Sequence, residues 1–113
     1  MPTIVEGVDF DTVAREWRLK WADADDKKSL AEVQKLMVSL LPEIKAESGS
    51  ASIQRVVCGG CKDYKLVVAL PAEKFGDWEK KDFAPEAKFL EGVKKIEGVS
   101  TVETQTYTLM PVS

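Results

Sequence analysis

The chain has 113 residues, enough for one compact domain with its own apolar core. Its net charge of −3 and its interspersed signs argue against a nucleic-acid-binding protein, which would present a basic surface. The chain contains no histidine. This excludes Ser-His-Asp and Cys-His catalysis, histidine-ligated haem, and zinc or iron sites that depend on histidine. Any acid–base chemistry must use Asp, Glu, Lys, Tyr or Cys.

Membrane and secretion signals are also absent from the sequence pattern. No apolar run approaches the roughly 20 residues that span a bilayer. The first six residues, Met1 to Glu6, contain neither the basic region nor the long apolar region of a signal peptide. We therefore expect a cytoplasmic protein with no membrane partner, and a single domain over residues 1–113 that begins with an extended arm at residues 1–11.

Residues 12–22 alternate between apolar and polar side chains. A period of two favours a strand, although many of these residues are also good helix formers. One face of this strand holds Val13, Trp17, Leu19 and Trp21, with Arg15 as the exception, and the other holds Ala14, Glu16, Arg18, Lys20 and Ala22.

A long helix is predicted next. Residues 23–28 form a polar loop, and Ser29 with Glu32 has the spacing of a capping box. Pro42 lies within the apolar stripe and lacks an amide donor, so we expect a kink or break near Leu41. The segment ends at residues 48–50. The stripe comprises Leu30, Val33, Met37, Leu40, Leu41 and Ile44.

Two strands follow, at residues 53–58 and 64–70, joined by the turn Cys58-Gly59-Gly60-Cys61. We expect the glycines to supply the positive φ that tight hairpins need. Residues 72–81 predict a weak helix interrupted by Gly76, and residues 87–96 predict a second main helix closed by Gly98. The threonine-rich residues 101–112 predict the last strand.

The predicted order is therefore β-α-β-β-α-β, the ferredoxin-like α+β plan. It places a four-stranded antiparallel sheet under two helices that cover one face. The second face is bare in a monomer, so it requires a partner or a ligand.

Several short motifs resemble those of the dimeric α+β barrel superfamily: residues 63–70, 89–93, 96–99 and 102–104. That superfamily includes stress-responsive A/B-barrel proteins, the ligand-binding domains of Lrp/AsnC-type regulators, small monooxygenases and polyketide cyclases. The resemblance covers residues 12–112 in element order. It implies a homodimer in which two bare sheet faces form a barrel with a cavity. The chain departs from the pattern at residues 83–87, which lack the histidines often found there, and no helix-turn-helix precedes the barrel.

The pair Cys58 and Cys61 has three possible interpretations: plain turn residues, a redox-sensitive disulfide, or half of a four-thiolate metal site shared between two protomers. The turn is not at a helix N-terminus, so the usual means of lowering a thiol pKa is missing. Two thiols without histidine cannot complete a zinc site in one chain, and we predict neither a metal nor a cofactor.

The polar face of the sheet is the second candidate site. An arginine there would bind a carboxylate through two hydrogen bonds, and a tyrosine could serve as a weak acid. The alternative is that these charges pair across strands or face solvent. The candidates for catalysis are Tyr107, Glu103 and Glu16, and those for ligand binding are Arg18, Lys65 and Gln105.

The sequence thus predicts a homodimeric α+β barrel protein that binds a small molecule in the barrel. The alternatives are a cofactor-independent enzyme, namely a cyclase, isomerase or monooxygenase, and a structural or adaptor subunit. The aromatic residues Phe75, Trp78, Phe83 and Phe89 are expected to anchor the core or an interface rather than bind a cofactor.

Overall fold

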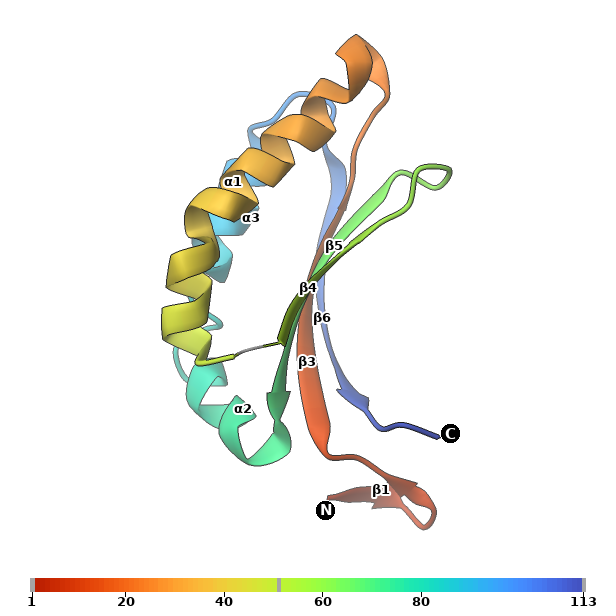
Figure 1. Ribbon diagram of the computed structural model, residues 1–113, viewed down its shortest axis with the longest axis vertical. Coiled ribbons are helices and arrows are strands. Elements are labelled where there is room, and N and C mark those ends of the chain that lie inside the picture. Colours follow the sequence, from red (N-terminus) through yellow and green to blue (C-terminus); the bar gives the residue numbers. More distant parts are fainter. Residues whose placement is uncertain (1, 51, 113) are drawn as a thin grey trace.

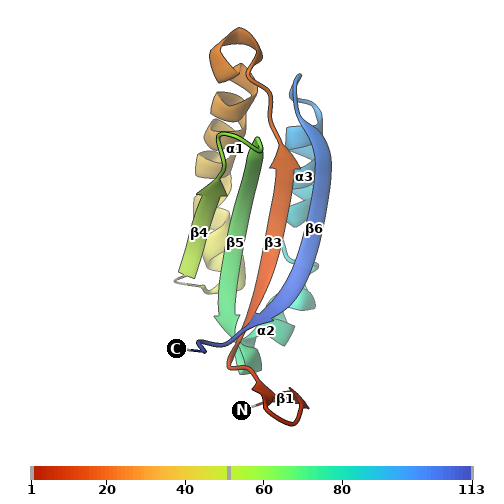
Figure 2. The ribbon, with the colours of Figure 1, turned by 90° about the vertical axis from the view of Figure 1, so that its right-hand side faces the viewer.

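The computed structural model describes residues 2–50 and 52–112 and has two layers, a sheet and a set of helices on one side of it (Figure 1). Four antiparallel strands follow the spatial order β4-β5-β3-β6. This is the predicted ferredoxin-like order, and Figure 2 shows the face that no helix covers. The elements are β1 (Thr3–Val5), β2 (Val8–Asp9), β3 (Thr12–Lys20), α1 (Ala24–Ser48), β4 (Ser52–Val57), β5 (Asp63–Pro71), α2 (Ala72–Glu79), α3 (Glu86–Lys94) and β6 (Ser100–Leu109).

Aromatic side chains fill the core between the sheet and the helices, as predicted. Trp17 of β3 is completely buried and stacks on Phe89 of α3, with ring centroids 5.1 Å apart. Trp78 of α2 contacts both Trp17 and Phe83. Arg15, the exception on this face, forms an ion pair with Glu86 at 2.8 Å. Its charge is therefore compensated where it enters the helix layer, and the alternation of β3 is preserved.

The start of α1 differs from the prediction. The helix is assigned from Ala24, but Asp25, Asp26 and Lys27 have left-handed φ angles between 52° and 63°, so the regular helix begins only after Lys27. The prediction that Ser29 and Glu32 form a capping box is wrong. The Ser29 hydroxyl instead accepts a hydrogen bond from the Ala22 amide and donates one to the Ala22 carbonyl. Ser29 thus links the helix to the segment that follows β3.

The predicted break near Leu41 and the predicted interruption at Gly76 do not occur, although α1 bends along its length (Figure 1). The helix α1 continues through Pro42 to Ser48, and α2 continues through Gly76. Pro42 is exposed, and its missing amide removes one hydrogen bond from the helix. The predicted end at Gly49 is confirmed, since this residue has φ 69° and its amide donates to the Lys45 carbonyl.

The turn between β4 and β5 is closed by a disulfide between Cys58 and Cys61, whose Cα atoms are 5.5 Å apart. The positive φ of this turn belongs to Lys62, at 62°, and not to Gly59 or Gly60 as predicted. A lysine can occupy this conformation at a cost that its contacts must offset. Its ammonium group bonds the Gly59 carbonyl at 2.8 Å and lies over the Trp21 ring.

The N-terminal arm is a small hairpin of β1 and β2 rather than an extended segment. The Phe10 amide donates to the Pro2 carbonyl, and Thr3 bonds Asp9 through their side chains. The hairpin projects beyond the end of the main sheet (Figure 2). Gly7, at φ 83°, forms its turn, a conformation that glycine adopts at no steric cost.

Candidate functional site on the open sheet face

The polar residues proposed from the sequence lie together on the face of the sheet opposite the helices. Cross-strand register pairs Glu16 of β3 with Val67 of β5 and Gln105 of β6, and it pairs Arg18 with Lys65 and Glu103. Paired residues project to the same side of a sheet, and Trp17 and Leu19 fill the opposite side. We call the following residues the polar cluster: Glu16, Arg18, Lys65, Glu103, Gln105 and Tyr107.

Glu16 is the centre of the polar cluster. Its side chain is buried, with the residue only 5% exposed, although no helix covers this face. The Tyr107 hydroxyl donates a hydrogen bond to Glu16 Oε1 at 3.1 Å. The second carboxylate oxygen, Oε2, is buried without a hydrogen-bond partner among the described residues. A buried carboxylate oxygen that accepts no hydrogen bond lowers the stability of the folded chain.

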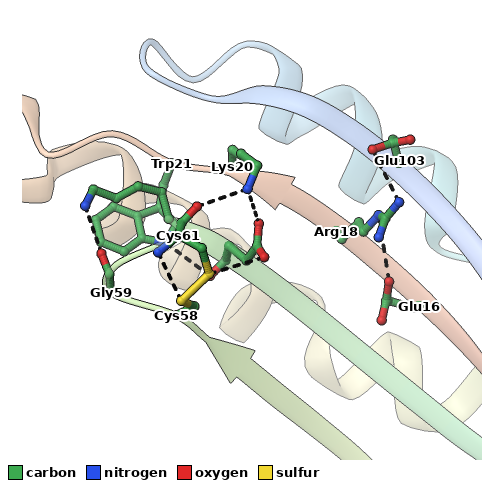
Figure 3. Close-up of polar contacts among 10 residues, drawn as sticks. Glu16, Arg18, Lys20, Trp21, Cys58, Gly59, Cys61 and Glu103 are labelled. Atoms are coloured by element: carbon green, nitrogen blue, oxygen red, sulfur yellow. Dashed lines mark hydrogen bonds and ion pairs between the residues drawn. A yellow bond between two sulfur atoms is a disulfide. The ribbon is translucent and has the colours of Figure 1, made fainter.

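Arg18 covers Glu16 and connects it to the edge strand. Arg18 Nε lies 3.9 Å from Glu16 Oε2, and Arg18 Nη2 lies 3.5 Å from Glu103 Oε1 (Figure 3). Both contacts are long for charge-assisted hydrogen bonds, and Nε, like Oε2, is buried without a partner among the described residues. The Arg18 side chain is 38% exposed, so it can move away from Glu16 without disturbing the core. The polar cluster therefore has features of both interpretations made from the sequence: its charges pair across strands, and it lies on a face that a ligand can reach.

The Tyr107 hydroxyl stays protonated at neutral pH. Burial, followed by the hydrogen bond to Glu16 and the charge of that carboxylate, raises the pKa of Tyr107 to about 12. Each of these effects disfavours the phenolate. In any chemistry at neutral pH this group can therefore donate a hydrogen bond or a proton, but it does not act as a base.

A second polar group that sequence reasoning did not identify lies at the end of the same face. Lys20 Nζ contacts Asp63 Oδ1 at 2.6 Å and also donates to the Cys61 carbonyl at 3.0 Å (Figure 3). The hydrogen bond from Lys20 holds the pKa of the Asp63 carboxyl below its usual range, with the nearby positive charges contributing. The period-two pattern placed Lys20 on this face, but only the register shows that Asp63 lies opposite.

The open face is shallowly hollowed on both sides of Glu16. One hollow of about 200 Å³ lies beside Arg18, Lys20, Asp63 and Glu103. Another of about 460 Å³ lies near the opposite end, where Val67 and Ala69 of β5 face the chain after β6. A larger hollow of about 640 Å³ is formed by the start of α1 and residues 95–98, and it contains none of the polar cluster. Two shallow hollows flanking a buried carboxylate become an enclosed cavity only when a second surface covers them.

The two cysteines are bonded to each other, which removes the free thiols that a shared metal site would need. Within the residues that the structure describes, no group of three or more Cys, Asp or Glu side chains could hold a metal ion. No described helix is long and apolar enough to cross a membrane.

Comparison with known proteins identifies the fold. No family pattern and no curated protein matches this sequence. Among solved structures, a provisionally assigned antibiotic biosynthesis monooxygenase of Deinococcus radiodurans superposes with a TM-score of 0.64 at 12% identity, covering 89% of this chain and 95% of that one. SnoaB, a cofactor-independent oxygenase of Streptomyces nogalater, superposes with a TM-score of 0.60 at 14% identity, covering 90% of this chain and 96% of that one.

A third similar structure is a de novo designed protein with a ferredoxin fold. It superposes with a TM-score of 0.57 at 18% identity, covering 90% of this chain and 89% of that one. The chain therefore has the ferredoxin-like α+β fold that proteins of the antibiotic biosynthesis monooxygenase type also adopt. At these identities the likeness concerns the fold and not the site.

Proposed function

We propose that this chain is a small-molecule-binding protein that works as a homodimer, with two open sheet faces enclosing the polar cluster. The observation that supports this proposal is the buried Glu16 carboxylate on an otherwise uncovered face, with Oε2 unpartnered among the described residues. A monomer gains nothing from this arrangement, because a buried polar group without a partner destabilises the fold. A ligand that donates a hydrogen bond to Oε2 offsets that cost.

The chemistry of the cluster suggests the class of ligand. Oε2 of Glu16 needs a donor such as a hydroxyl group, and the Arg18 guanidinium suits a carboxylate, which it binds through two hydrogen bonds. Glu103, whose side chain is half exposed, can release Arg18 to such a ligand and turn toward solvent. A small hydroxy carboxylic acid provides both groups, with Lys65 and Gln105 positioned on neighbouring strands to contact its remainder.

Native mass spectrometry of the purified protein, with and without a reductant, tests assembly and loading together. A dimer with added mass is expected, and the added mass identifies the ligand. A thermal-shift screen with small hydroxy carboxylic acids then tests the site, with Glu16→Gln expected to abolish the stabilisation. Glu43→Gln is the matched control, because Glu43 lies on α1 in an ion pair with Lys88, away from the open face. A monomer without binding contradicts the proposal.

One observation favours an enzymatic role as the second candidate. Tyr107 and Glu16 form a hydrogen-bonded pair of an acid and a carboxylate, as a cofactor-independent cyclase, isomerase or monooxygenase would need. Tyr107→Phe would then abolish turnover while leaving the thermal stability nearly unchanged. If turnover persists, Tyr107 has no catalytic role.

An adaptor role would instead show as a protein partner that displaces the homodimer. A cytoplasmic location is part of the proposal.

A further inference from the structure

The disulfide in the β4–β5 turn has two sulfur atoms in different surroundings. Cys61 is exposed, whereas Cys58 is only partly exposed. The disulfide lies in the turn at the end of the sheet, near Lys20 (Figure 3). Asp63 also contacts Cys61 Sγ. The described fold does not depend on this bond for its core, since the buried side chains of the core lie elsewhere in the sheet and helices. An exposed disulfide outside the core is accessible to small thiols.

The Cys58 sulfur is the one that the backbone stabilises. The amide of Cys61 donates to Cys58 Sγ at 3.1 Å. A hydrogen bond to a thiolate favours the charged form, so this amide makes Cys58 the better leaving group when the disulfide is cleaved. The donor belongs to the same short turn, so it remains in place after the S–S bond breaks.

The Cys61 sulfur has a carboxylate neighbour instead. Asp63 Oδ2 lies 3.4 Å from Cys61 Sγ, and the other oxygen of this carboxylate, Oδ1, contacts Lys20 Nζ at 2.6 Å. In the disulfide form this is a contact without a proton, and in the reduced form the Cys61 thiol can donate to Asp63. A hydrogen bond from the thiol to this carboxylate favours the protonated sulfur over the thiolate. Lys62, the other cation of the turn, is held by the Gly59 carbonyl and by Asp23.

We propose that this turn is a thiol–disulfide exchange site for a low-molecular-weight thiol, in which Cys61 is attacked and Cys58 leaves. The external thiolate attacks Cys61 Sγ, a mixed disulfide forms there, and the S–S electron pair departs with Cys58 as a thiolate. A second thiolate then attacks the external sulfur of the mixed disulfide and releases Cys61, which takes a proton. The net reaction oxidises two small thiols to one disulfide and reduces the protein disulfide to a dithiol.

The site is tested with glutathione as the probe. The oxidised protein is mixed with excess glutathione, quenched with N-ethylmaleimide, and digested with trypsin; residues 56–62 then form one peptide that contains both sulfurs. Fragment ions are expected to place glutathione on Cys61 and maleimide on Cys58. The reverse placement, or a disulfide that glutathione leaves intact, overturns the proposal.

Single-cysteine variants test the asymmetry separately. Cys58 in the Cys61→Ser variant is expected to react with a thiol reagent several-fold faster at neutral pH than Cys61 in the Cys58→Ser variant, because a larger fraction of Cys58 is thiolate. Asp63→Asn in the Cys58→Ser background should speed the reaction of Cys61, while Glu43→Gln in the same background should not. Equal rates for the two cysteines, with circular dichroism showing both variants folded, contradict the assignment.

Discussion

At the scale of the residue, the burial of the Glu16 carboxylate lowers the stability of the fold. This carboxylate is buried with one oxygen unpaired among the described residues, whereas a buried group of this kind can often be replaced by an apolar residue of similar size without loss. We predict that Glu16→Met raises the free energy of unfolding by about 1 kcal/mol. Urea denaturation at several protein concentrations measures this, because any contribution from dimerisation varies with concentration.

The Tyr107→Phe and Glu16→Met double variant completes a cycle for this pair. Its free energy of unfolding should differ little from that of the single Glu16→Met variant. In that single variant the Tyr107 hydroxyl has already lost its acceptor and, being only partly buried, can bond water. If Glu16→Met instead lowers the free energy of unfolding by about 2 kcal/mol or more, the Glu16–Tyr107–Arg18 contacts stabilise the fold, and the buried carboxylate is a structural group rather than a ligand site.

The two tyrosines give a pH test at the same scale. Burial raises the pKa of both Tyr64 and Tyr107 to about 12, with the Glu16 contact adding to the shift of Tyr107. Well below pH 10, both the folded and the unfolded chain keep the two phenols protonated, so these two groups do not make stability depend on pH. Between pH 10 and 12 the unfolded chain loses these protons and the folded chain keeps them, so stability falls.

Ultraviolet absorbance of phenolate measures this shift directly, since the chain contains only two tyrosines. The folded protein is expected to show both transitions near pH 12, and the chain in guanidinium chloride near the ordinary value of 10. Tyr107→Phe should leave the Tyr64 transition in place. A transition of Tyr107 near pH 10 in the folded protein would mean that this side chain is solvated and not bonded to Glu16.

At the scale of the element, sequence periodicity was most reliable where packing enforces it. The alternation of residues 12–22 predicted β3 and both of its faces, because one face must fill the core. It could not reveal the left-handed Asp25–Lys27 segment or the Ser29 contact with Ala22, which depend on how α1 joins the sheet. The polar cluster was predicted as a set of residues, but the Tyr107–Glu16 bond depends on strand register that the sequence does not specify.

Pro42 provides a prediction at this scale. The helix α1 includes it without a break, although a proline in a helix interior is less favourable than alanine by about 3 kcal/mol. Packing of Ile44, Met37 and Val33 on the sheet offsets that cost. Pro42→Ala should therefore raise the free energy of unfolding by about 1 to 3 kcal/mol, measured by chemical denaturation. Exposed Ser39→Ala serves as the matched control. A decrease for Pro42→Ala would mean that the proline fixes a bend that the packing requires.

At the scale of the whole molecule, the two faces of the sheet differ in what covers them. The helix side has a complete aromatic core, whereas the open face displays Val56 and Leu109, both more than 40% exposed, together with the polar cluster. The edge strands β4 and β6 bound this face, and the central strands β3 and β5 carry its middle (Figure 2). A second copy placed face to face covers the apolar residues and encloses the hollows at the same time.

Val67 allows the assembly to be tested without disturbing the monomer. It lies in the middle of the open face, directly opposite Glu16, so Val67→Lys adds a cation that the neighbouring carboxylate can compensate in a monomer. In a face-to-face dimer the two added cations meet across the interface, and we expect the dissociation constant to rise at least about tenfold. Val38→Lys adds the same charge to the exposed side of α1, where Val38 is 54% exposed, and should leave the dimer intact. Sedimentation equilibrium compares the three proteins. Equal dimerisation of both variants would place the interface away from the open face, and a monomeric wild-type chain would remove the enclosed cavity on which the proposed ligand site depends.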